Sequence, residues 1–120
     1  MEKAIMKEKL SDQGVSNTRV IDEGILNIDR VIHEPARLKI VALLSVVERA
    51  DFLFLLRQTG LTKGNLSSHL SRLEEAGYVA VEKKFIERVP RTLLRLTDLG
   101  RKALRLYRRR LQTMLDQLPG

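Results

Sequence analysis

Cysteine is missing from this chain of 120 residues, and so are long apolar runs. A chain without cysteine forms neither disulfides nor thiolate metal sites, which favours an intracellular location. No apolar stretch approaches the roughly 18 residues that span a bilayer. The charged N-terminus, MEKAIMKEKLSDQG, is unlike a signal peptide. We therefore expect a cytoplasmic protein that has no membrane partner.

Side chains suited to catalysis or metal binding are also scarce. His33 and His69 are the only histidines, and Arg37 stands where a zinc motif beginning at His33-Glu34 needs its second histidine. His69 flanks an apolar stripe, so we expect it to be packed and hydrogen-bonded. No nucleophile, base and orienting group can be assembled, and no glycine loop for phosphate occurs. We predict no enzyme, no metal site and no cofactor.

Positive charge is concentrated in the second half of the chain. Residues 1–60 carry 9 basic and 9 acidic side chains, whereas residues 61–120 carry 13 basic and 6 acidic ones and supply the whole net charge of +7. The length suits one domain with a modest core. The asymmetry favours a polyanionic partner, with nucleic acid the leading candidate and an acidic membrane surface the lesser one.

The segment LTKGNLSSHLSRLEEAGYV, residues 61–79, contains a complete helix signal. Thr62 can cap the N-terminus, and Gly77 suits a left-handed C-terminal cap. Apolar residues recur at helical spacing at Leu66, Leu70 and Leu73. The pattern predicts a helix over Lys63–Ala76, the second helix of a helix-turn-helix.

The opposite face of this predicted helix is small, polar and edged with basic residues. It carries Gly64, Ser67, Ser68 and Ser71, flanked by Lys63, Asn65 and Arg72. Small hydroxyl residues let a helix approach a DNA major groove closely, and the alternative is a serine-rich solvated face.

Within this face we assign different roles to different residues. Asn65 and Arg72 have side chains that can read an adenine or a guanine edge. The free backbone N–H groups of Thr62, Lys63 and Gly64 favour a phosphate. For Arg72 the alternative is an ion pair with Glu74 or Glu75.

Three further helices are predicted before this one. Asn27 can cap a short helix over Ile28–Ile32, and Pro35 can begin a helix that runs to about Val47. Asp51 can cap a third helix that ends at Gly60. The residues expected to be buried are Leu38, Val41, Ala42 and Leu44 or Leu43 in the second helix, and Phe52, Leu55 and Leu56 in the third.

After Gly77 the pattern changes to the alternation of a hairpin. Strands are predicted over Tyr78–Phe85 and Thr92–Leu96, joined by a charged turn over Ile86–Arg91 that Pro90 would stiffen. Such a hairpin after a recognition helix makes a winged helix. The basic residues expected to contact DNA from this wing are Lys83, Lys84, Arg88 and Arg91, and the alternative is an ordinary charged hairpin tip.

A final helix is predicted from a Thr97 cap to about Leu118. Its apolar residues alternate at spacings of three and four, which forms an a/d seam over Leu104, Tyr107, Leu111, Met114 and Leu118. This seam packs either against a second copy or back on its own domain. The run Arg101, Lys102, Arg105, Arg108, Arg109 and Arg110 flanks the seam, so we favour a structural or solvated role for it over a DNA-binding arm.

The chain resembles the MarR/ArsR-like winged-helix transcriptional regulators, in particular their small single-domain members. The resemblance covers about residues 25–115 and rests on HEPARLKIVALL (33–44), LTKGNLSSHLSRLEEAGYV (61–79) and VPRTLLRLTDLGRKAL (89–104). It implies a homodimer that binds double-stranded DNA, with the recognition helix in the major groove, the wing at the minor groove and dimer contacts from terminal helices. Whether a small-molecule effector binds is left open.

One departure from the family lies at Leu53 and Phe54, where polar residues are more common, so that Phe52–Leu56 is continuously apolar. We expect this patch to be buried within the domain or a dimer, since five consecutive apolar residues seldom stay solvated.

The expected architecture is mainly α with a small β-hairpin. It comprises an N-terminal segment (1–24), partly flexible or helical, a winged helix-turn-helix domain (25–97) and a C-terminal dimerisation helix (98–120). Two other functions stay open: a winged helix that binds proteins, which the Leu53/Phe54 patch would support, and an architectural DNA binder indifferent to sequence.

Overall fold

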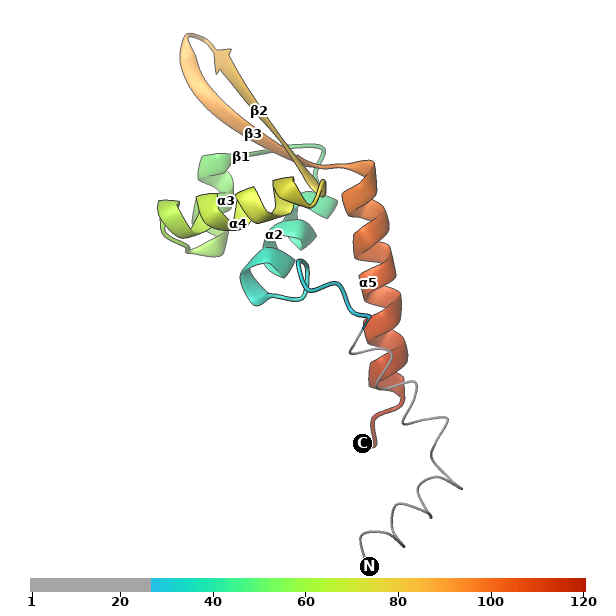
Figure 1. Ribbon diagram of the computed structural model, residues 1–120. Coiled ribbons are helices and arrows are strands. Elements are labelled where there is room, and N and C mark those ends of the chain that lie inside the picture. Colours follow the sequence, from blue (N-terminus) through green and yellow to red (C-terminus); the bar gives the residue numbers. More distant parts are fainter. Residues whose placement is uncertain (1–26) are drawn as a thin grey trace, which may run out of the picture. The chain divides into compact units, whose positions relative to one another are not determined.

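The computed structural model describes residues 27–120, so the predicted segment 1–24 lies outside the described residues. Helices and strands follow one another in the order of a winged helix (Figure 1). The elements are α2 (Pro35–Ser45), β1 (Ala50–Asp51), α3 (Phe52–Thr59), α4 (Lys63–Glu75), β2 (Val79–Ile86), β3 (Val89–Leu96) and α5 (Asp98–Asp116). The predicted fold class is confirmed. No helix within residues 27–120 is long and apolar enough to cross a membrane.

The chain divides into two compact units. Residues 29–106 form one unit, which holds α2 to β3 and the first half of α5. The described part of the other unit consists of residues 27–28 and 107–120, with the second half of α5.

The predicted short helix over Ile28–Ile32 is wrong, because the structure has a turn there. The Asp29 carboxylate accepts hydrogen bonds from the N–H groups of Val31 (2.9 Å) and Ile32 (3.2 Å). The His33 N–H donates to the Asp29 carbonyl at 2.7 Å, which closes one turn. The chain then enters α2 directly, so Asp29, rather than Asn27, supplies the local cap.

Helix α2 begins at Pro35 as predicted and ends two residues before the predicted Val47. The Glu34 carboxylate caps it by accepting from the N–H groups of Ala36 (3.2 Å) and Arg37 (2.7 Å). Its buried residues are Ile40, Val41 and Leu44. The predicted burial of Ala42 is wrong: it is exposed. At about 100° per residue, Ala42 lies on the opposite side of the helix from the buried Ile40.

The helix-turn-helix forms as predicted. The Asp51 carboxylate accepts from the Leu53 N–H at 2.7 Å and caps α3, and Gly60 ends that helix in the left-handed region with φ 69°. Leu61 and Thr62 make the turn into α4. The Thr62 hydroxyl then accepts from the Asn65 N–H at 3.1 Å, which is the predicted N-cap.

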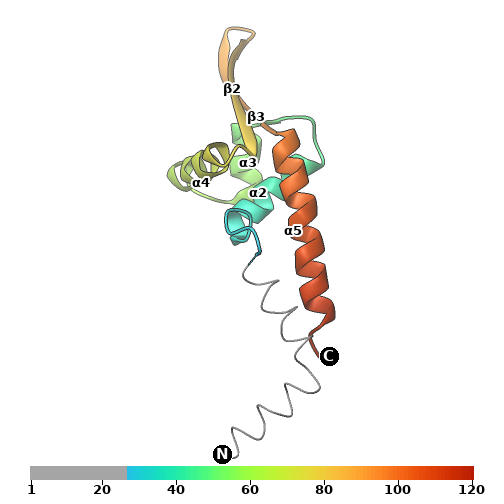
Figure 2. The ribbon, with the colours of Figure 1, turned by 45° about the vertical axis from the view of Figure 1, so that its right-hand side comes forward.

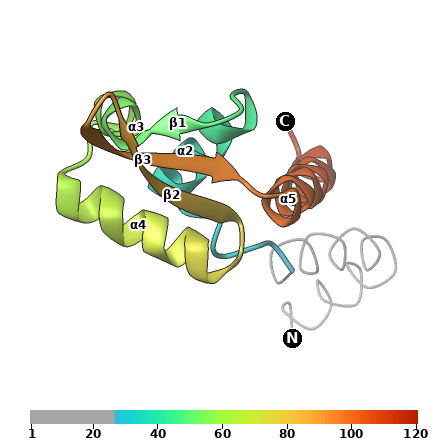
Figure 3. The same ribbon diagram turned by 90° about the horizontal axis from the view of Figure 1, so that it is seen from above.

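The hairpin is longer than predicted, and its turn is tighter. Strands β2 and β3 pair antiparallel from Val79–Leu96 to Ile86–Val89, so only Glu87 and Arg88 form the turn. Both turn residues have positive φ, 52° and 67°, as a type I′ hairpin requires. Pro90 therefore lies within β3, rather than in the turn. Strand β1 was not predicted, and it adds to the free edge of β3 to give the order β1-β3-β2 (Figure 3).

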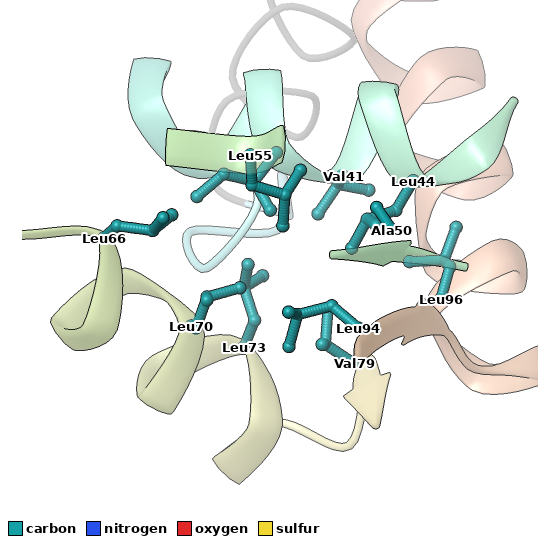
Figure 4. Close-up of a cluster of buried hydrophobic side chains, with 11 residues drawn as sticks. Val41, Leu44, Ala50, Leu55, Leu66, Leu70, Leu73, Val79, Leu94 and Leu96 are labelled. Atoms are coloured by element: carbon teal, nitrogen blue, oxygen red, sulfur yellow. The ribbon is translucent and has the colours of Figure 1, made fainter. Parts of the chain in front are cut away.

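The hydrophobic core of the larger unit lies between the helices and the inner face of the sheet (Figure 4). Leu55 of α3, Leu66 and Leu73 of α4, and Leu94 of β3 are fully buried in it. Helix α5 begins against this core: the Thr97 hydroxyl accepts from the Gly100 N–H at 3.0 Å. A Cβ at Gly100 would lie 2.3 Å from the Tyr78 carbonyl oxygen, so this approach of α5 requires glycine.

Candidate nucleic-acid interface

Helix α4 is held on the core by its leucines and closed at both ends. Leu66, Leu70 and Leu73 are at most 5 % exposed. At the C-terminus Gly77 adopts φ 81° and donates to the Glu74 carbonyl, while Tyr78 N–H donates to the Leu73 carbonyl at 3.0 Å. These two bonds are those of a Schellman motif. The predicted cap is therefore confirmed, and the outer face of α4 has a fixed orientation.

Every residue of α4 and its cap that the sequence assigned to DNA contact is exposed. The set is Thr62, Lys63, Gly64, Asn65, Ser67, Ser68, Ser71 and Arg72. Within residues 27–120, Arg72 forms no ion pair, so the alternative pairing with Glu74 or Glu75 does not occur. The face thus combines small hydroxyls with unpaired cations.

The N-terminal turn of α4 leaves backbone donors free. Leu66 N–H donates to the Thr62 carbonyl at 2.9 Å and Asn65 N–H to the Thr62 hydroxyl. In the described part of the chain, the N–H groups of Lys63 and Gly64 have no acceptor. A Cβ at Gly64 would meet nothing within 4 Å, so no neighbour in the described chain requires glycine there. This turn can therefore receive an anion closely.

The wing projects from the helices of its unit (Figure 2) and separates its charges by face. In an antiparallel pair, directly opposite residues share a face. Lys83 pairs with Thr92 and shares a face with the buried Val79 and Leu94, whereas Lys84 pairs with Arg91 on the other face. The fourth predicted wing cation, Arg88, stands in the turn between the strands.

Ion pairs neutralise one of these two faces. Arg91 contacts the Asp51 carboxylate at 3.1 Å, and Glu82 lies between Lys84 (3.1 Å) and Arg49 (3.5 Å). In the part of the chain that the structure describes, Lys83 and Arg88 form no ion pair. Lys84 and Arg91 are therefore paired with carboxylates, and Lys83 and Arg88 are the available wing cations.

A groove of about 430 Å³ joins α4 to the wing. Helix α4 lines it with Ser67, Ser71 and Glu74, and the wing lines it with Lys83 and Thr92. Strand β2 is the strand that packs against α4 (Figure 3). The hydroxyl face of the helix and the Lys83 face of the wing therefore border the same groove, whose lining also includes the apolar side chains Phe52, Leu70, Val81 and Leu94.

The predicted histidine environment is confirmed. His69 Nδ1 lies 3.2 Å from the Arg37 guanidinium and 3.7 Å from the Glu34 carboxylate, so α4 is tied to the start of α2. Arg37 in turn donates to the Val31 carbonyl at 2.7 Å. Burial alone would raise the pKa of the Glu34 carboxyl, but the hydrogen bonds that it accepts from the Arg37 and Ala36 N–H groups and the nearby Arg37 charge outweigh burial, so the pKa is lowered. Within the described residues, no cluster of side chains could hold a metal ion.

Helix α5 carries the residues predicted for dimerisation, and part of their seam is covered within the chain. Leu104 packs partly buried against the core of the larger unit, and Tyr107 is only 4 % exposed. Leu111 and Met114 are half-buried, while Leu118 is 49 % exposed. The dimer contact stays a prediction. The most accessible residues of the predicted seam lie toward the C-terminus of α5.

Two members of the basic run in α5 have structural contacts. Arg101 donates to the Ser45 carbonyl at 3.2 Å, and Arg110 donates to the Asn27 carbonyl at 2.7 Å. The other four, Lys102, Arg105, Arg108 and Arg109, are exposed. In the apolar patch of α3, Phe54 packs half-buried against the core and Leu53 stays 45 % exposed.

Two features of the wing were not predicted from the sequence: the apolar side chains at its tip and the pairing of Arg91 with β1. Phe85, Ile86 and Val89 are 78 %, 46 % and 48 % exposed at the tip. Alternation beyond Val81 could have indicated them, had the strand been extended past Phe85. No local signal indicates the contact of Arg91 with Asp51, because 40 residues separate them.

Known proteins share both the sequence pattern and the fold. Residues 36–115 match the model of the winged helix DNA-binding domain family. The protein MJ0432 of Methanocaldococcus jannaschii is 37 % identical over 78 residues, which covers 65 % of this chain and 85 % of that protein.

Two solved structures are similar to this chain in fold. The transcriptional regulator homologue of Pyrococcus horikoshii OT3 is 30 % identical and superposes with a TM-score of 0.73, covering 82 % of this chain and 95 % of that one. A MarR-family transcriptional regulator of Silicibacter pomeroyi is 22 % identical with a TM-score of 0.55, covering 91 % of this chain and 68 % of that one. This chain belongs to the winged-helix DNA-binding domain family, and it has the fold of the MarR-family transcriptional regulators.

Proposed function

We propose that this chain is a transcriptional regulator that binds double-stranded DNA as a homodimer, with α4 in the major groove and the wing at the minor groove. The observation that carries the proposal is the outer face of α4, where every predicted contact residue is exposed and Arg72 has no ion-pair partner within the described residues. A solvated helix face ordinarily carries long charged side chains that pair with one another. The outer face of α4 instead carries serine and glycine between its cations.

The roles follow from the geometry of each group. Lys63 and the free N–H of Gly64 would hold a phosphate at the helix N-terminus. Ser67, Ser68 and Ser71 would permit close approach, and Asn65 and Arg72 would read base edges. On the wing, Lys83 and Arg88 would contribute positive charge to the minor groove. The family membership and the basic second half of the chain support the same assignment.

A charge change on α4 with a matched control tests the major-groove contact. Duplexes selected from a random pool by the wild-type chain would be offered to Ser68→Glu and to Ala42→Glu. Both positions are exposed, but Ala42 lies on α2 away from the core face. We expect Ser68→Glu to weaken binding at least about a hundredfold, because its carboxylate repels phosphate and its longer side chain prevents the close approach of α4 to the groove. Ala42→Glu should bind as the wild type does, and equal binding by both variants would refute the contact.

The dimer is tested on α5. Met114 is half-buried and Thr113 exposed on the same helix. We expect Met114→Asp to sediment as a monomer and Thr113→Asp as a dimer, with helix content checked by circular dichroism. A dimer that persists in Met114→Asp would move the interface elsewhere. Equal affinity for selected and random duplexes would instead favour an architectural binder, and no binding at low salt would favour a protein-interaction module.

A further inference from the structure

The tip of the wing carries apolar side chains where a hairpin in water ordinarily carries polar ones. Phe85 is 78 % exposed and its cross-strand partner Pro90 is exposed as well. Ile86 and Val89, the next pair, are 46 % and 48 % exposed. Large apolar groups that gather on a surface generally mark a site of contact. A phenylalanine at the tip of an extended hairpin therefore requires a partner to explain it.

Strand register places the Phe85–Pro90 pair on the side of the hairpin that borders α4. Along that face the pairs run from Val81–Leu94 to Lys83–Thr92 and then to Phe85–Pro90. The first two pairs line the groove whose other wall carries Ser67 and Ser71 of α4. Phe85 thus continues, at the tip, the same face that meets the recognition helix at the base.

The charges beside Phe85 favour an anionic partner. Lys83 lies two residues before it on the same face, and Arg88 stands with Glu87 in the turn, one residue pair beyond Phe85. Within residues 27–120, neither cation forms an ion pair. Lys83 and Arg88 carry two positive charges and Glu87 one negative charge, so two copies docked tip to tip would bring like net charges together. A polyanion would instead neutralise them while the apolar pair enters a less polar space.

We propose, on the basis of the DNA-binding role above, that Phe85 is an apolar wedge. The side chain, backed by Pro90, enters the minor groove and partly unstacks one base step, while Arg88 and Lys83 hold the flanking phosphates. Minor-groove proteins insert apolar residues in this manner and bend the duplex by about 20–90°. The turn holds only Glu87 and Arg88, so Phe85 lies within two residues of the end of the hairpin. Pyrimidine–purine steps unstack most readily, so bound sites should carry TA or CA at the wing position.

The experiment uses the full chain, a duplex selected by it, and 2-aminopurine placed at the step under the wing. Phe85→Ser is compared with Ile86→Ser, which removes an exposed apolar side chain from the opposite face of the same tip. For the wild type and Ile86→Ser we expect enhanced 2-aminopurine fluorescence and a bent duplex by end-to-end energy transfer. Phe85→Ser should lose both signals and bind about tenfold or more weakly, and Phe85→Leu should retain them.

Each result has one meaning. If the wild type selects no duplex, the proposed function itself fails. If it binds a selected duplex that is unbent and whose 2-aminopurine stays quenched, the wedge is overturned and the function stands. The same holds if Ile86→Ser loses the signals as Phe85→Ser does. If Phe85→Ser without DNA sediments as a smaller oligomer than the wild type, the tip is a contact between copies and the wedge is overturned. Because Phe85 is largely exposed, thermal unfolding should show that the variant stays folded.

Discussion

Replacing Gly64 by alanine should raise stability and weaken DNA binding at once. Gly64 is the second residue of α4, its backbone is not in the left-handed region, and a Cβ there meets nothing within 4 Å. Glycine in a helix costs about 0.5–1 kcal/mol relative to alanine, chiefly through the entropy of the unfolded chain. We therefore expect the free energy of unfolding to rise by about 0.5 kcal/mol. That gain raises Tm by about 2 °C in a chain of this size.

The effect on DNA has the opposite sign. The N–H groups of Lys63 and Gly64 have no acceptor within residues 27–120, and a phosphate bound there would approach the backbone at hydrogen-bond distance. A methyl group would force that phosphate back. A charge-assisted hydrogen bond contributes about 1.5–3 kcal/mol, so its loss should weaken binding about 10- to 100-fold.

Two measurements on one variant decide the matter, with Thr113→Ala on the exposed face of α5 as the control. Fluorescence anisotropy with a selected duplex gives the affinity, and calorimetry gives Tm. Thr113→Ala should gain similar stability through helix propensity and bind DNA unchanged. Gly64→Ala that binds as tightly as the wild type would refute the phosphate contact. A fall in Tm would refute the inferred freedom of the backbone at this position.

Two further predictions concern charge and protonation. Arg88→Ala should lower the magnitude of the slope of log DNA-binding constant against log salt concentration by about 0.9 for each phosphate that Arg88 neutralises. Arg91→Ala should change this slope little, because Arg91 is paired with Asp51. Equal slopes for the two variants would contradict the assignment of Arg88 as an available cation and Arg91 as a paired one. Burial and a hydrogen bond to Asp29 raise the pKa of Tyr78 to about 12 from 10.0. The folded chain therefore keeps this proton longer than the unfolded chain, so stability present below about pH 10 is lost as pH rises toward 12. Denaturant unfolding at pH 8 and 11.5 should show a smaller fall in stability for Tyr78→Phe than for the wild type, by up to about 2 kcal/mol, and an equal fall would exclude the linkage.

How far the sequence predicts the structure depends on whether a signal is local. Helix α4 was predicted to within one residue, because its hydroxyl cap, three leucines and terminal glycine all lie within one segment. The wing was predicted too short, because Pro90 indicated a turn. Strand β1 pairs with β3 only at Leu93 and Leu94, so Pro90 lies where one edge of β3 is open and the missing N–H breaks no ladder there.

The turn itself offered no signal at all. Type I′ turns favour asparagine and glycine, whereas Glu87 and Arg88 occupy it here. The hairpin register, set by the paired residues of both strands, imposes the left-handed backbone on residues that seldom choose it. Tertiary structure overrode local propensity at the tip of the wing, beside Phe85.

The candidate site shows why counting charges falls short of locating a binding surface. All of Lys83, Lys84, Arg88 and Arg91 are equivalent in the sequence, yet β1 brings Asp51 to Arg91 and the register brings Glu82 beside Lys84. Asp51 also caps α3 with its other carboxylate oxygen, so the group that starts a helix neutralises one wing cation. The wing cations that remain available to DNA are Lys83, on the face that continues from α4 to Phe85, and Arg88, in the turn at the end of that face. A cation that is paired with a carboxylate must break that ion pair before it can neutralise a phosphate and release the counterions of the DNA. The salt dependence of binding should therefore reflect Lys83 and Arg88 rather than the formal charge of the whole wing.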